Sequence, residues 1–332
     1  CGHHVAFQVS RVVISVRYRI GSFNMKNWGK SSRRDFEKIS DIIRGEELDV
    51  VAFQEVLSEG AGVRQWLETS VRFNLYDWGF CWGYPKESSD TEKIQEMILE
   101  DKRGEGYAYI WNKKKFKLTG TQKNGEKRVF EPRIINTLSN DVKSNCSIFA
   151  RTPYYIRLQP CYGGFFDLRL LNIHIYHGKT GSLTDIEKRK IEYHILTQEI
   201  YPQISQHRYG DFRPAYTIAM GDYNLNILRP ERSTNVQEII DVPEYGSVIT
   251  AQHQLSTLKS TESVQDEQLY GGAAFSSKIG VNNYDHFSYG SKVFSDVSCY
   301  VIEAIHKYCG DDIDYYRKNI SDHLPIVMEI KL

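Results

Sequence analysis

The sequence predicts a layered α/β domain, in which helices pack on β-sheets. Short apolar runs rich in Val, Ile, Tyr and Phe recur along the 332 residues, and each has the length of a buried strand. Segments with helical periodicity lie between these runs, and polar residues follow the runs at their ends. Helices that alternate with strands indicate a layered α/β architecture.

Six apolar runs are predicted as strands, because they are short and rich in β-branched and aromatic residues. In chain order they are YRIGSFN (18–24), LDVVAFQE (48–55), GYAYIWN (106–112), FFDLRLLNIH (165–174), AYTIAMGDYN (215–224) and HLPIVMEI (323–330). Each run suits a strand that is buried on at least one face, as the strands of a layered α/β domain are.

Two segments have the periodicity of an amphipathic helix. The first, residues 33–45, is predicted to end at Gly45 as its C-cap and to bury Phe36, Ile39, Ile42 and Ile43. The second, residues 183–204, is predicted to start at Thr184 as its N-cap and to bury Ile186, Ile191, Ile195, Leu196 and Ile200.

The balance of charge argues against a broad polycationic surface. The chain has 42 Lys and Arg residues against 42 Asp and Glu residues, so its formal net charge is zero. A small basic groove is compatible with this balance, because a metal ion can supply positive charge where a phosphate lies. Hydrophobic residues make up 41% of the chain, which excludes wholesale disorder. No stretch approaches the roughly 18 apolar residues of a membrane helix.

The N-terminal segment and the cysteines leave the compartment open. Residues 1–17 are predicted as an N-terminal extension or an extra strand, rather than a secretory signal, before a single domain over 18–332. Cys1 is compatible with lipid modification, but a processed or trimmed terminus is the expectation. Six cysteines without a CxxC pair are too sparse for a disulfide-framed fold, and one or two disulfides remain open.

Polar residues fall where the predicted strands end. Asn24, Glu55, His174, Asp222 and Asn224 each follow an apolar run, and Asp322 with His323 opens the last one. Strand ends meet at one edge of a sheet, so residues far apart in the sequence are expected to share one site. Each residue alone is more often a turn or solvated residue, and the argument rests on their number and order.

This set of side chains suits the hydrolysis of a phosphorus ester by water. Glu55 and Asp322 are hard oxygen donors, and Asn24 adds a neutral oxygen donor, a set that suits Mg²⁺, Mn²⁺ or Ca²⁺ rather than a soft metal. Two histidines, His174 and His323, can exchange protons near neutral pH. Carboxylates that can orient them are available at Glu105 and Asp285, and Asp222 and Asn224 are expected on one side of a strand.

Six motifs occur in the order of a known family. SFN (22–24), FQE (53–55), NIHI (172–175), GDYN (221–224), YDH (284–286) and SDHLPI (321–326) resemble the endonuclease/exonuclease/phosphatase family, the deoxyribonuclease I-like proteins. The resemblance runs from about residue 18 to the C-terminus. It implies a four-layer α/β sandwich, with two mostly antiparallel sheets packed face to face and flanked by helices.

The resemblance also implies roles for individual residues. Asn24 and Glu55 match metal positions, and Asp322 matches a further metal or water ligand. His174 matches a histidine that contacts the scissile phosphate and can protonate the leaving oxygen, and Glu105 matches the carboxylate that holds it. The remaining matches are Asp222 and Asn224, which orient water and phosphate, His323 with its partner Asp285, Arg151 on the substrate phosphate, and Arg103, where the nuclease pattern often has a Tyr. Which histidine is acid and which is base stays open, as does the number of metals.

We expect a Mg²⁺-dependent phosphodiesterase of low sequence specificity that cleaves nucleic acid and acts as a monomer, with Mn²⁺ or Ca²⁺ as substitutes for Mg²⁺. DNA is the expected substrate, and RNA is the alternative. The Trp-Cys-Asp-Arg pattern of phosphatases is absent around Asp285, which favours a nuclease. The alternative is a phosphomonoesterase or a lipid or inositol phosphodiesterase on the same scaffold. A non-catalytic binding module is the weakest hypothesis, because no catalytic group is lost.

Three further regions have both a functional and a structural interpretation. A basic run is either a solvated hairpin or a ridge that tracks phosphates, and it comprises Lys113, Lys114, Lys115, Lys117, Lys123, Lys127 and Arg128. Arg33 and Arg34 are a possible second phosphate contact. The polar tracts 82–104 and 251–283 are expected to be surface insertions, with lids or partner surfaces as the alternative.

Overall fold

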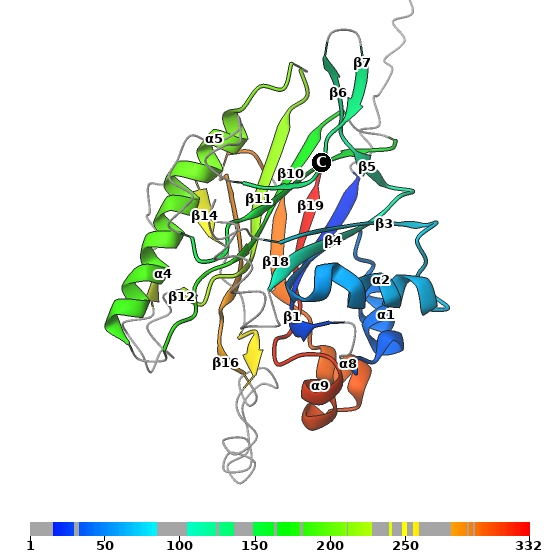
Figure 1. The fold of residues 1–332 in the computed structure, drawn as a ribbon, viewed down its shortest axis with the longest axis vertical. Helices are drawn as coiled ribbons and strands as arrows, with labels where there is room; N and C mark the ends of the chain where they lie inside the picture. The colour runs from blue at the N-terminus through cyan, green and yellow to red at the C-terminus, as the bar shows by residue number, and fades with distance from the viewer. Residues whose placement is uncertain are drawn as a thin grey trace, which may run out of the picture.

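Two β-sheets packed face to face form the centre of the molecule, and helices cover their outer faces (Figure 1). The computed structural model describes residues 16–29, 33–84, 105–123, 126–135, 149–162, 165–179, 182–210, 212–227, 239–240, 248–250, 255–258, 280–290, 292–294 and 296–332. Over these ranges the layers follow the order helix, sheet, sheet, helix. The predicted four-layer α/β sandwich is therefore confirmed.

The first sheet has the strand order β18-β19-β1-β2-β4-β3. Its strands are β1 (Arg17–Trp28), β2 (Val50–Val56), β3 (Trp78–Gly83), β4 (Gly106–Asn112), β18 (Val297–Val301) and β19 (Ile326–Lys331). The central pair β1 and β2 is parallel, and the other neighbours are antiparallel. The two ends of the described chain meet here, because the backbone of Val16 and Leu332 exchanges hydrogen bonds of 3.1 Å.

The second sheet has the strand order β14-β17-β11-β10-β9-β5, with β8 paired to β9. Its strands are β5 (Phe116–Leu118), β8 (Arg133–Ile134), β9 (Tyr154–Pro160), β10 (Asp167–His174), β11 (Ala215–Asp222), β14 (Val248–Thr250) and β17 (Asp285–Gly290). Here too the central pair, β10 and β11, is parallel. Small two-stranded pairings lie outside these sheets: β6 (Gly120–Lys123) with β7 (Glu126–Val129), β12 (Asn226–Ile227) with β13 (Ile239–Ile240), and β15 (Thr257–Leu258) with β16 (Gly280–Asn282).

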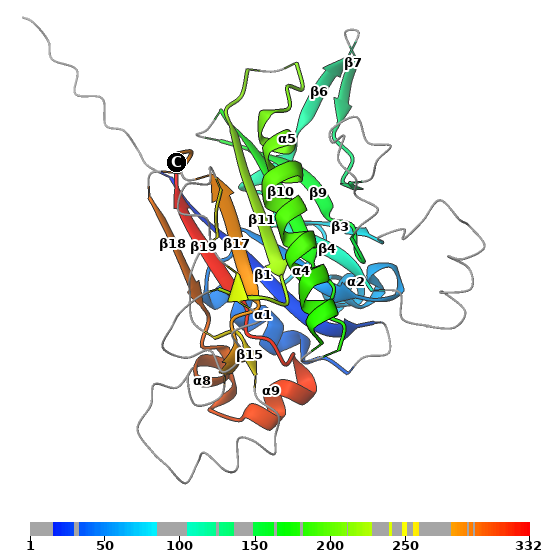
Figure 2. The ribbon, with the colours of Figure 1, turned by 90° about the vertical axis from the view of Figure 1, so that its left-hand side faces the viewer.

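Helices cover the outer face of each sheet (Figures 1 and 2). The first sheet is covered by α1 (Phe36–Gly45), the short 3₁₀ turn η1 (Ser58–Gly60) and α2 (Ala61–Thr69), with α8 (Ala304–Cys309) and α9 (Ile313–Asn319) beside α1. The second sheet is covered by α4 (Leu183–Ile195), the π-helical turn η3 (Leu196–Ile200) and α5 (Tyr201–Gln206), which run on as one rod. None of the helices in the described part of the chain is long and apolar enough to cross a membrane.

Alternation along the strands builds the layers. In β2, Phe53 packs outward on Trp66 of α2, with ring centroids 6.3 Å apart, while Gln54 points to the other sheet and donates to Asn172 at 2.6 Å. In β10, Leu168 and Leu170 belong to a hydrophobic core that includes residues of both sheets, whereas Leu171 and Ile173 pack with the helical rod. Period-two alternation therefore gives both faces of each sheet a buried partner.

The predicted helix caps are wrong in detail. Gly45 is the last residue of α1 rather than its cap, which is Glu46, and a Cβ at Gly45 would collide with the Tyr308 hydroxyl. The helical rod starts at Ser182, whose side chain accepts from the Asp185 amide, rather than at Thr184. Gly45 thus serves the close approach of α8, and Ser182 provides the N-cap.

The predicted buried face of the rod is also only partly right. Ile191 is 42% exposed, while Arg189 and Glu192 are buried on the inner face. Hydrophobic periodicity assigns charged residues to solvent, so it cannot indicate a helix that turns two charged side chains inward.

The described cysteines, Cys81, Cys161, Cys299 and Cys309, are free thiols. Cys1 and Cys146 lie outside the described residues, as does most of the predicted N-terminal extension 1–17.

Candidate active site

The predicted site residues gather at the carboxyl ends of the two central parallel strand pairs. Asn24 lies on β1, Glu55 on β2, His174 on β10 and Asp222 on β11. The amide of Asn24 donates to Asp222 Oδ2 at 2.9 Å across 198 residues of sequence, which joins the two sheets. The expectation that strand ends meet at one edge is confirmed for these residues.

Asn24 orients Glu55 through its amide group. Its Nδ2 donates to Glu55 Oε1 at 3.0 Å, while its Oδ1 accepts from the Lys26 amide at 3.0 Å. The other oxygen of Glu55 accepts from the backbone of Asn27 at 3.0 Å. In this arrangement Asn24 holds the predicted metal ligand Glu55 in place, and its own oxygen faces the backbone.

Positive backbone φ angles gather around this part of the site. Lys26, Asn27 and Glu55 have φ of 46°, 60° and 55°, and Asn224 has φ of 49°. Left-handed φ in residues other than glycine costs free energy and is found at sites where the surroundings enforce it. The backbone conformation at the strand ends therefore sets the direction of these side chains.

Asp322 lies against a cation. Its Oδ2 is 2.7 Å from the Lys26 ammonium, and its side chain is 28% exposed. Burial alone would raise the pKa of Asp322, but the positive charges of His323 and Lys26 outweigh it and lower the pKa below its usual value. The carboxylate therefore stays ionised.

His323 and Asp285 form a buried dyad. His323 Nδ1 is 2.8 Å from Asp285 Oδ2, and the Ser256 hydroxyl donates to the same oxygen at 2.6 Å. Burial by itself would lower the pKa of His323, but the charges of Asp285, Asp222 and Asp322 raise it to about 10. The carboxylates therefore favour the imidazolium form of the ring, whose Nε2 is 3.7 Å from Asp222 Oδ2.

Asp222 is the carboxylate shared by both histidines. Its Oδ2 is 3.7 Å from His323 Nε2 and 3.8 Å from His174 Nε2. Burial raises the pKa of Asp222 to about 7, with the charge of His323 acting in the opposite direction. Because the two groups interact, they titrate as a pair.

His174 is buried and has a low pKa. Its side chain is 4% exposed, and burial, then the positive charges of Arg151 and His323, lower its pKa well below 6.5. Glu105 Oε2 is 3.6 Å from Nδ1, which is ion-pair range but too long for a hydrogen bond. A neutral His174 suits hydrogen bonding to phosphate better than proton donation to a leaving group.

Arg151 pairs with Glu105 in an ion pair beside His174. The Tyr107 hydroxyl connects the end of β10 to the segment before β9, because it accepts from the backbone N–H of His174 at 3.1 Å and donates to the Arg151 carbonyl at 3.2 Å. Arg103, the other predicted phosphate contact, lies outside the described residues.

The GDYN motif makes a sharp turn at the end of β11. Gly221 has φ of 145°, and a Cβ there would lie 1.9 Å from the Ile173 carbonyl oxygen, so only glycine fits. The strand ends at Asp222. Asn224 adopts a left-handed conformation in which its backbone N–H donates to Asp222 Oδ1 at 2.8 Å. The prediction of a strand through Asn224 is wrong, yet the turn keeps the two side chains together.

A buried polar bridge lies behind the strand ends. The Gln54 amide donates to Asn172 Oδ1 at 2.6 Å and to Ser22 Oγ at 3.1 Å, and Asn172 donates to the Phe53 carbonyl at 2.9 Å. These residues belong to the SFN, FQE and NIHI motifs. Because buried amides without partners are costly, the bridge fixes how the two sheets align under the site.

The donor set fits a hard divalent cation. Glu55 and Asp322 flank the same segment, because Glu55 accepts from Asn24 and Asn27 and Asp322 binds Lys26. The Lys26 ammonium occupies the kind of position that a cation takes beside carboxylates. Asp222, Asp285 and His323 form a second compact group, with ligand atoms within 4.8 Å of one another, but the Asp285–His323 hydrogen bond already uses one ligand atom of each. The oxygens of Glu55 and Asp322 are likewise engaged, by Asn24, Asn27 and Lys26, so the assignment of the metal to Glu55 and Asp322 stays a prediction.

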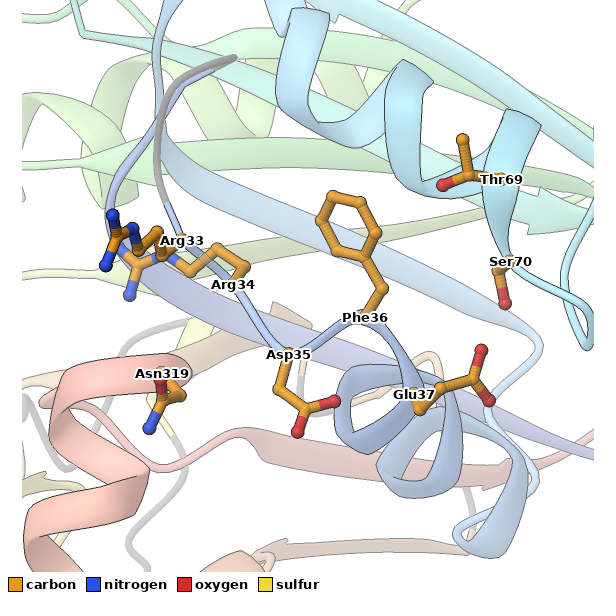
Figure 3. Close-up of a pocket in the computed structure, with 8 residues that line it drawn as sticks. All are labelled: Arg33, Arg34, Asp35, Phe36, Glu37, Thr69, Ser70 and Asn319. Carbon is orange, nitrogen blue, oxygen red and sulfur yellow. The ribbon is translucent and has the colours of Figure 1, made fainter.

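A hollow of about 510 Å³ lies at the start of α1 (Figure 3). Arg34 donates to the carbonyls of Met25, Lys26 and Ile320, so it braces the site instead of reaching substrate. Arg33 is exposed at the rim. Of Arg33 and Arg34, the pair considered as a second phosphate contact, Arg33 is the one that is exposed to solvent.

Three lysines of the basic run lie away from the site. Lys113, Lys114 and Lys115 follow the end of β4, whose first residue, Gly106, pairs with Val56 next to Glu55. Lys114 and Lys115 form ion pairs with Asp77 and Asp49, and the Lys113 ammonium donates to the Leu75 carbonyl at 2.5 Å. The hypothesis of a phosphate-tracking ridge next to the site is wrong for these three lysines, because β4 runs away from it.

The tract 251–283 is not merely a surface insertion. Ser256 holds Asp285, and the backbone at 256–258 pairs with 322–324, where Leu258 donates to the Asp322 carbonyl at 2.9 Å. The tract has no periodicity that would have revealed this contact. Another residue missed in the sequence is His177, whose spacing of three after His174 is its only signal. In the other polar tract, residues 82–83 belong to β3, and 85–104 lie outside the described residues.

Comparisons with known proteins agree with this architecture. No protein-family model and no curated protein matches the sequence. The chain is similar to the structure of ANGEL2, a 2′,3′-cyclic phosphatase, in complex with adenosine-2′,3′-vanadate, with a TM-score of 0.53, 13% identity, and 96% of each chain covered. It is also similar to truncated TDP2 from Caenorhabditis elegans, with a TM-score of 0.51, 14% identity, and 95% of this chain and 98% of that chain covered.

A third similar structure is an endonuclease/exonuclease/phosphatase family protein from Bacteroides thetaiotaomicron. Its TM-score is 0.50, its identity is 12%, and 96% of each chain is covered. At such identities the likeness establishes the fold, and it agrees with the fold that the six motifs imply.

Proposed function

We propose that this chain, which has the endonuclease/exonuclease/phosphatase fold, is a divalent-metal-dependent hydrolase of phosphate esters. More narrowly, we propose a phosphodiesterase that cleaves the backbone of nucleic acid. The observation that carries the proposal is the convergence of Asn24, Glu55, Asp222 and the His323–Asp285 dyad at one edge of two sheets.

Glu55 and Asp322 are the residues that would hold Mg²⁺, with Asn24 orienting Glu55. When bound, the ion supplies Lewis-acid stabilisation of the charge that develops on the phosphate oxygens. Lys26 must leave Asp322 for this, and its side chain is 48% exposed, so it has room to move.

The protein's own groups divide the proton transfers between them. His323 carries a proton that Asp285 stabilises, so its Nε2–H donates to a phosphate oxygen or to the leaving oxygen. Asp222, with a pKa of about 7, accepts the proton of the attacking water. Titratable neighbours whose pKa values are pushed apart are typical of an acid and a base at one site.

Neutral His174 and Arg151 bind the substrate phosphate. Glu105 keeps the guanidinium of Arg151 aimed beside His174. A guanidinium matches the geometry of a phosphate, so Arg151 positions the ester without reading a base.

The choice of nucleic acid rests on the nuclease-type match of Glu105 and Arg151 and on Arg33 at the rim of the adjoining hollow. A phosphomonoester, a lipid or an inositol phosphate is the alternative. The similar protein ANGEL2 is described as a 2′,3′-cyclic phosphatase, so a cyclic nucleotide phosphate belongs among the substrates to be tested.

The experiment is a substrate panel with Mg²⁺, with and without EDTA. Supercoiled plasmid, single-stranded RNA, 2′,3′-cyclic AMP, 4-nitrophenyl phosphate and an inositol phosphate are compared for the parent, Asp222→Asn and Asp311→Asn. Asp311 is an exposed control near α8. We expect plasmid nicking that requires metal and Asp222 and is unaffected at Asp311.

Hydrolysis of only the monoesters would replace the nuclease proposal with a phosphatase. No hydrolysis of any substrate by folded, metal-loaded protein would overturn the proposal of a phosphoesterase.

A further inference from the structure

We propose that His177 is a positioning residue that fixes the side-chain amide of Asn224 for the hydrolytic reaction. This inference rests on the proposed function. His177 Nδ1 is 2.9 Å from Asn224 Oδ1, and the amide nitrogen of Asn224 donates to the Ile175 carbonyl at 2.8 Å.

These two contacts determine which way the Asn224 amide faces. An amide oxygen accepts only from a donor, so His177 must carry its proton on Nδ1. The Ile175 carbonyl accepts only from the nitrogen, which excludes the flipped amide. The residue itself stays next to Asp222, because the backbone N–H of Asn224 donates to Asp222 Oδ1 at 2.8 Å.

The helix α4 holds the segment on which His177 lies. Arg189 is completely buried and donates to the carbonyls of His177, at 2.7 Å, and of Asn224, at 3.1 Å. Its guanidinium therefore joins the two chain segments that the His177–Asn224 contact also joins.

Glu192, one turn further along α4, holds the neighbouring segments. Its two oxygens accept from the amides of Ala150, at 3.0 Å, and Tyr176, at 3.1 Å. Tyr176 precedes His177, and Ala150 precedes Arg151. Arg189 and Glu192 thus hold the backbone of these segments, whereas His177 holds the side chain of Asn224.

The exposure of His177 separates this role from a structural one. Its side chain is exposed, so its removal leaves no cavity in the core. A small misplacement of a group that orients substrate is enough to slow catalysis strongly. Loss of His177 is therefore expected to affect turnover far more than stability.

The first test compares His177→Ala, His177→Asn and His177→Gln in plasmid nicking with Mg²⁺. Asparagine places an amide N–H where histidine has Nδ1, whereas glutamine places it one bond further out. We expect kcat to fall roughly 10-fold or more in the alanine and glutamine variants, with KM changed less than about 3-fold, and to be largely retained in His177→Asn.

Two controls isolate the contact. His306→Ala removes an exposed histidine with a similar bond, 2.8 Å from Asp311, and is expected to leave kcat unchanged. In an Asn224→Ala background, His177→Ala is expected to cost nothing further, because the side chain that it orients is gone.

The second test does not depend on activity. The side-chain amide resonances of Asn224, assigned by their loss in Asn224→Ala, are followed by NMR. We expect them to shift and broaden in His177→Ala and to keep their parental positions in His177→Asn.

The outcomes are distinct. If the parent nicks DNA and His177→Ala turns over like the parent, the inference is wrong while the proposed function stands. If the parent hydrolyses no phosphate ester, the proposed function fails, and the NMR result decides the inference: unchanged Asn224 resonances in His177→Ala overturn it, and altered ones support it.

Discussion

The buried dyad of His323 and Asp285 offers a perturbation whose size follows from the structure. The two side chains are joined by a hydrogen bond of 2.8 Å, and both are buried. Asp285→Asn keeps the shape of the side chain and removes its charge. The variant therefore tests whether that charge is what keeps a proton on His323.

The magnitude follows from the raised pKa of His323. Against the effect of burial, the three neighbouring carboxylates raise the pKa from 6.5 to about 10, and Asp285 contributes most among them. At about 1.4 kcal/mol for each pKa unit, this rise favours the imidazolium by about 5 kcal/mol. We expect Asp285→Asn to lower the pKa of His323 by on the order of two units and turnover by on the order of 10²-fold or more.

The effect on stability has a definite sign. Since the pKa of His323 is higher in the folded protein, its contribution is fully present below about pH 6.5 and is lost as the pH rises through about 10. The free energy of unfolding of the parent should therefore exceed that of Asp285→Asn most at pH 6.5, and the gap should narrow toward pH 10.

The assay is an NMR titration of the His323 ring in metal-free protein, combined with urea unfolding at both pH values. We predict that the parent ring stays protonated well above pH 8 and that the ring of Asp285→Asn loses its proton about two pH units lower than the parent ring. The same titration midpoint in both proteins would refute the electrostatic account of the dyad.

Three further predictions concern other parts of the molecule. His174→Ala removes a hydrogen bond to the phosphate and should lower turnover on the order of 10²-fold without loss of folding. An unchanged rate on every substrate would remove His174 from the mechanism. Asp167→Ala removes the carboxylate that lies 2.7 Å from Arg157 and 2.8 Å from Arg169, two buried arginines. The free energy of unfolding in urea should therefore fall by about 3–5 kcal/mol, and a fall below about 1 kcal/mol would contradict this. Burial raises the pKa of Glu192 from 4.5 to about 7, so the free energy of unfolding should fall as the pH rises through that window. Glu192→Gln should remove this pH dependence, and an equal pH dependence of the free energy of unfolding in both proteins would contradict the prediction.

The sequence is a good guide to the strand ends. Asn24, Glu55, His174 and Asp222 follow apolar runs, and the sheet geometry then brings them together without any long-range information. The order of the motifs adds the partner of His323, because Asp285 begins a strand next to β11.

Contacts that depend on the direction of a strand in the sheet cannot be predicted from apolar runs. The lysines after β4 follow an apolar run just as Glu55 does, but β4 is antiparallel to β2, so they lie at the far end of the sheet. Nothing in the composition of a strand indicates which of its ends faces the site.

Buried charged residues on helices are also not predicted from the sequence. Arg189 and Glu192 lie where an amphipathic pattern requires apolar residues, because backbone groups of the neighbouring loops need partners there. The role of Ser256 is also not predicted from the sequence, because its hydrogen bond to Asp285 spans 29 residues without regular periodicity.

The central claim is that a divalent metal held by Glu55 drives phosphate-ester hydrolysis. The most direct measurement is the Mg²⁺ dependence of plasmid nicking for the parent, Glu55→Gln and the exposed control Glu59→Gln. We predict that EDTA abolishes nicking by the parent, that Glu55→Gln needs on the order of 10-fold more Mg²⁺ for half-maximal rate, and that Glu59→Gln matches the parent. Equal Mg²⁺ dependence in the parent and Glu55→Gln, or nicking that survives EDTA, would contradict the account.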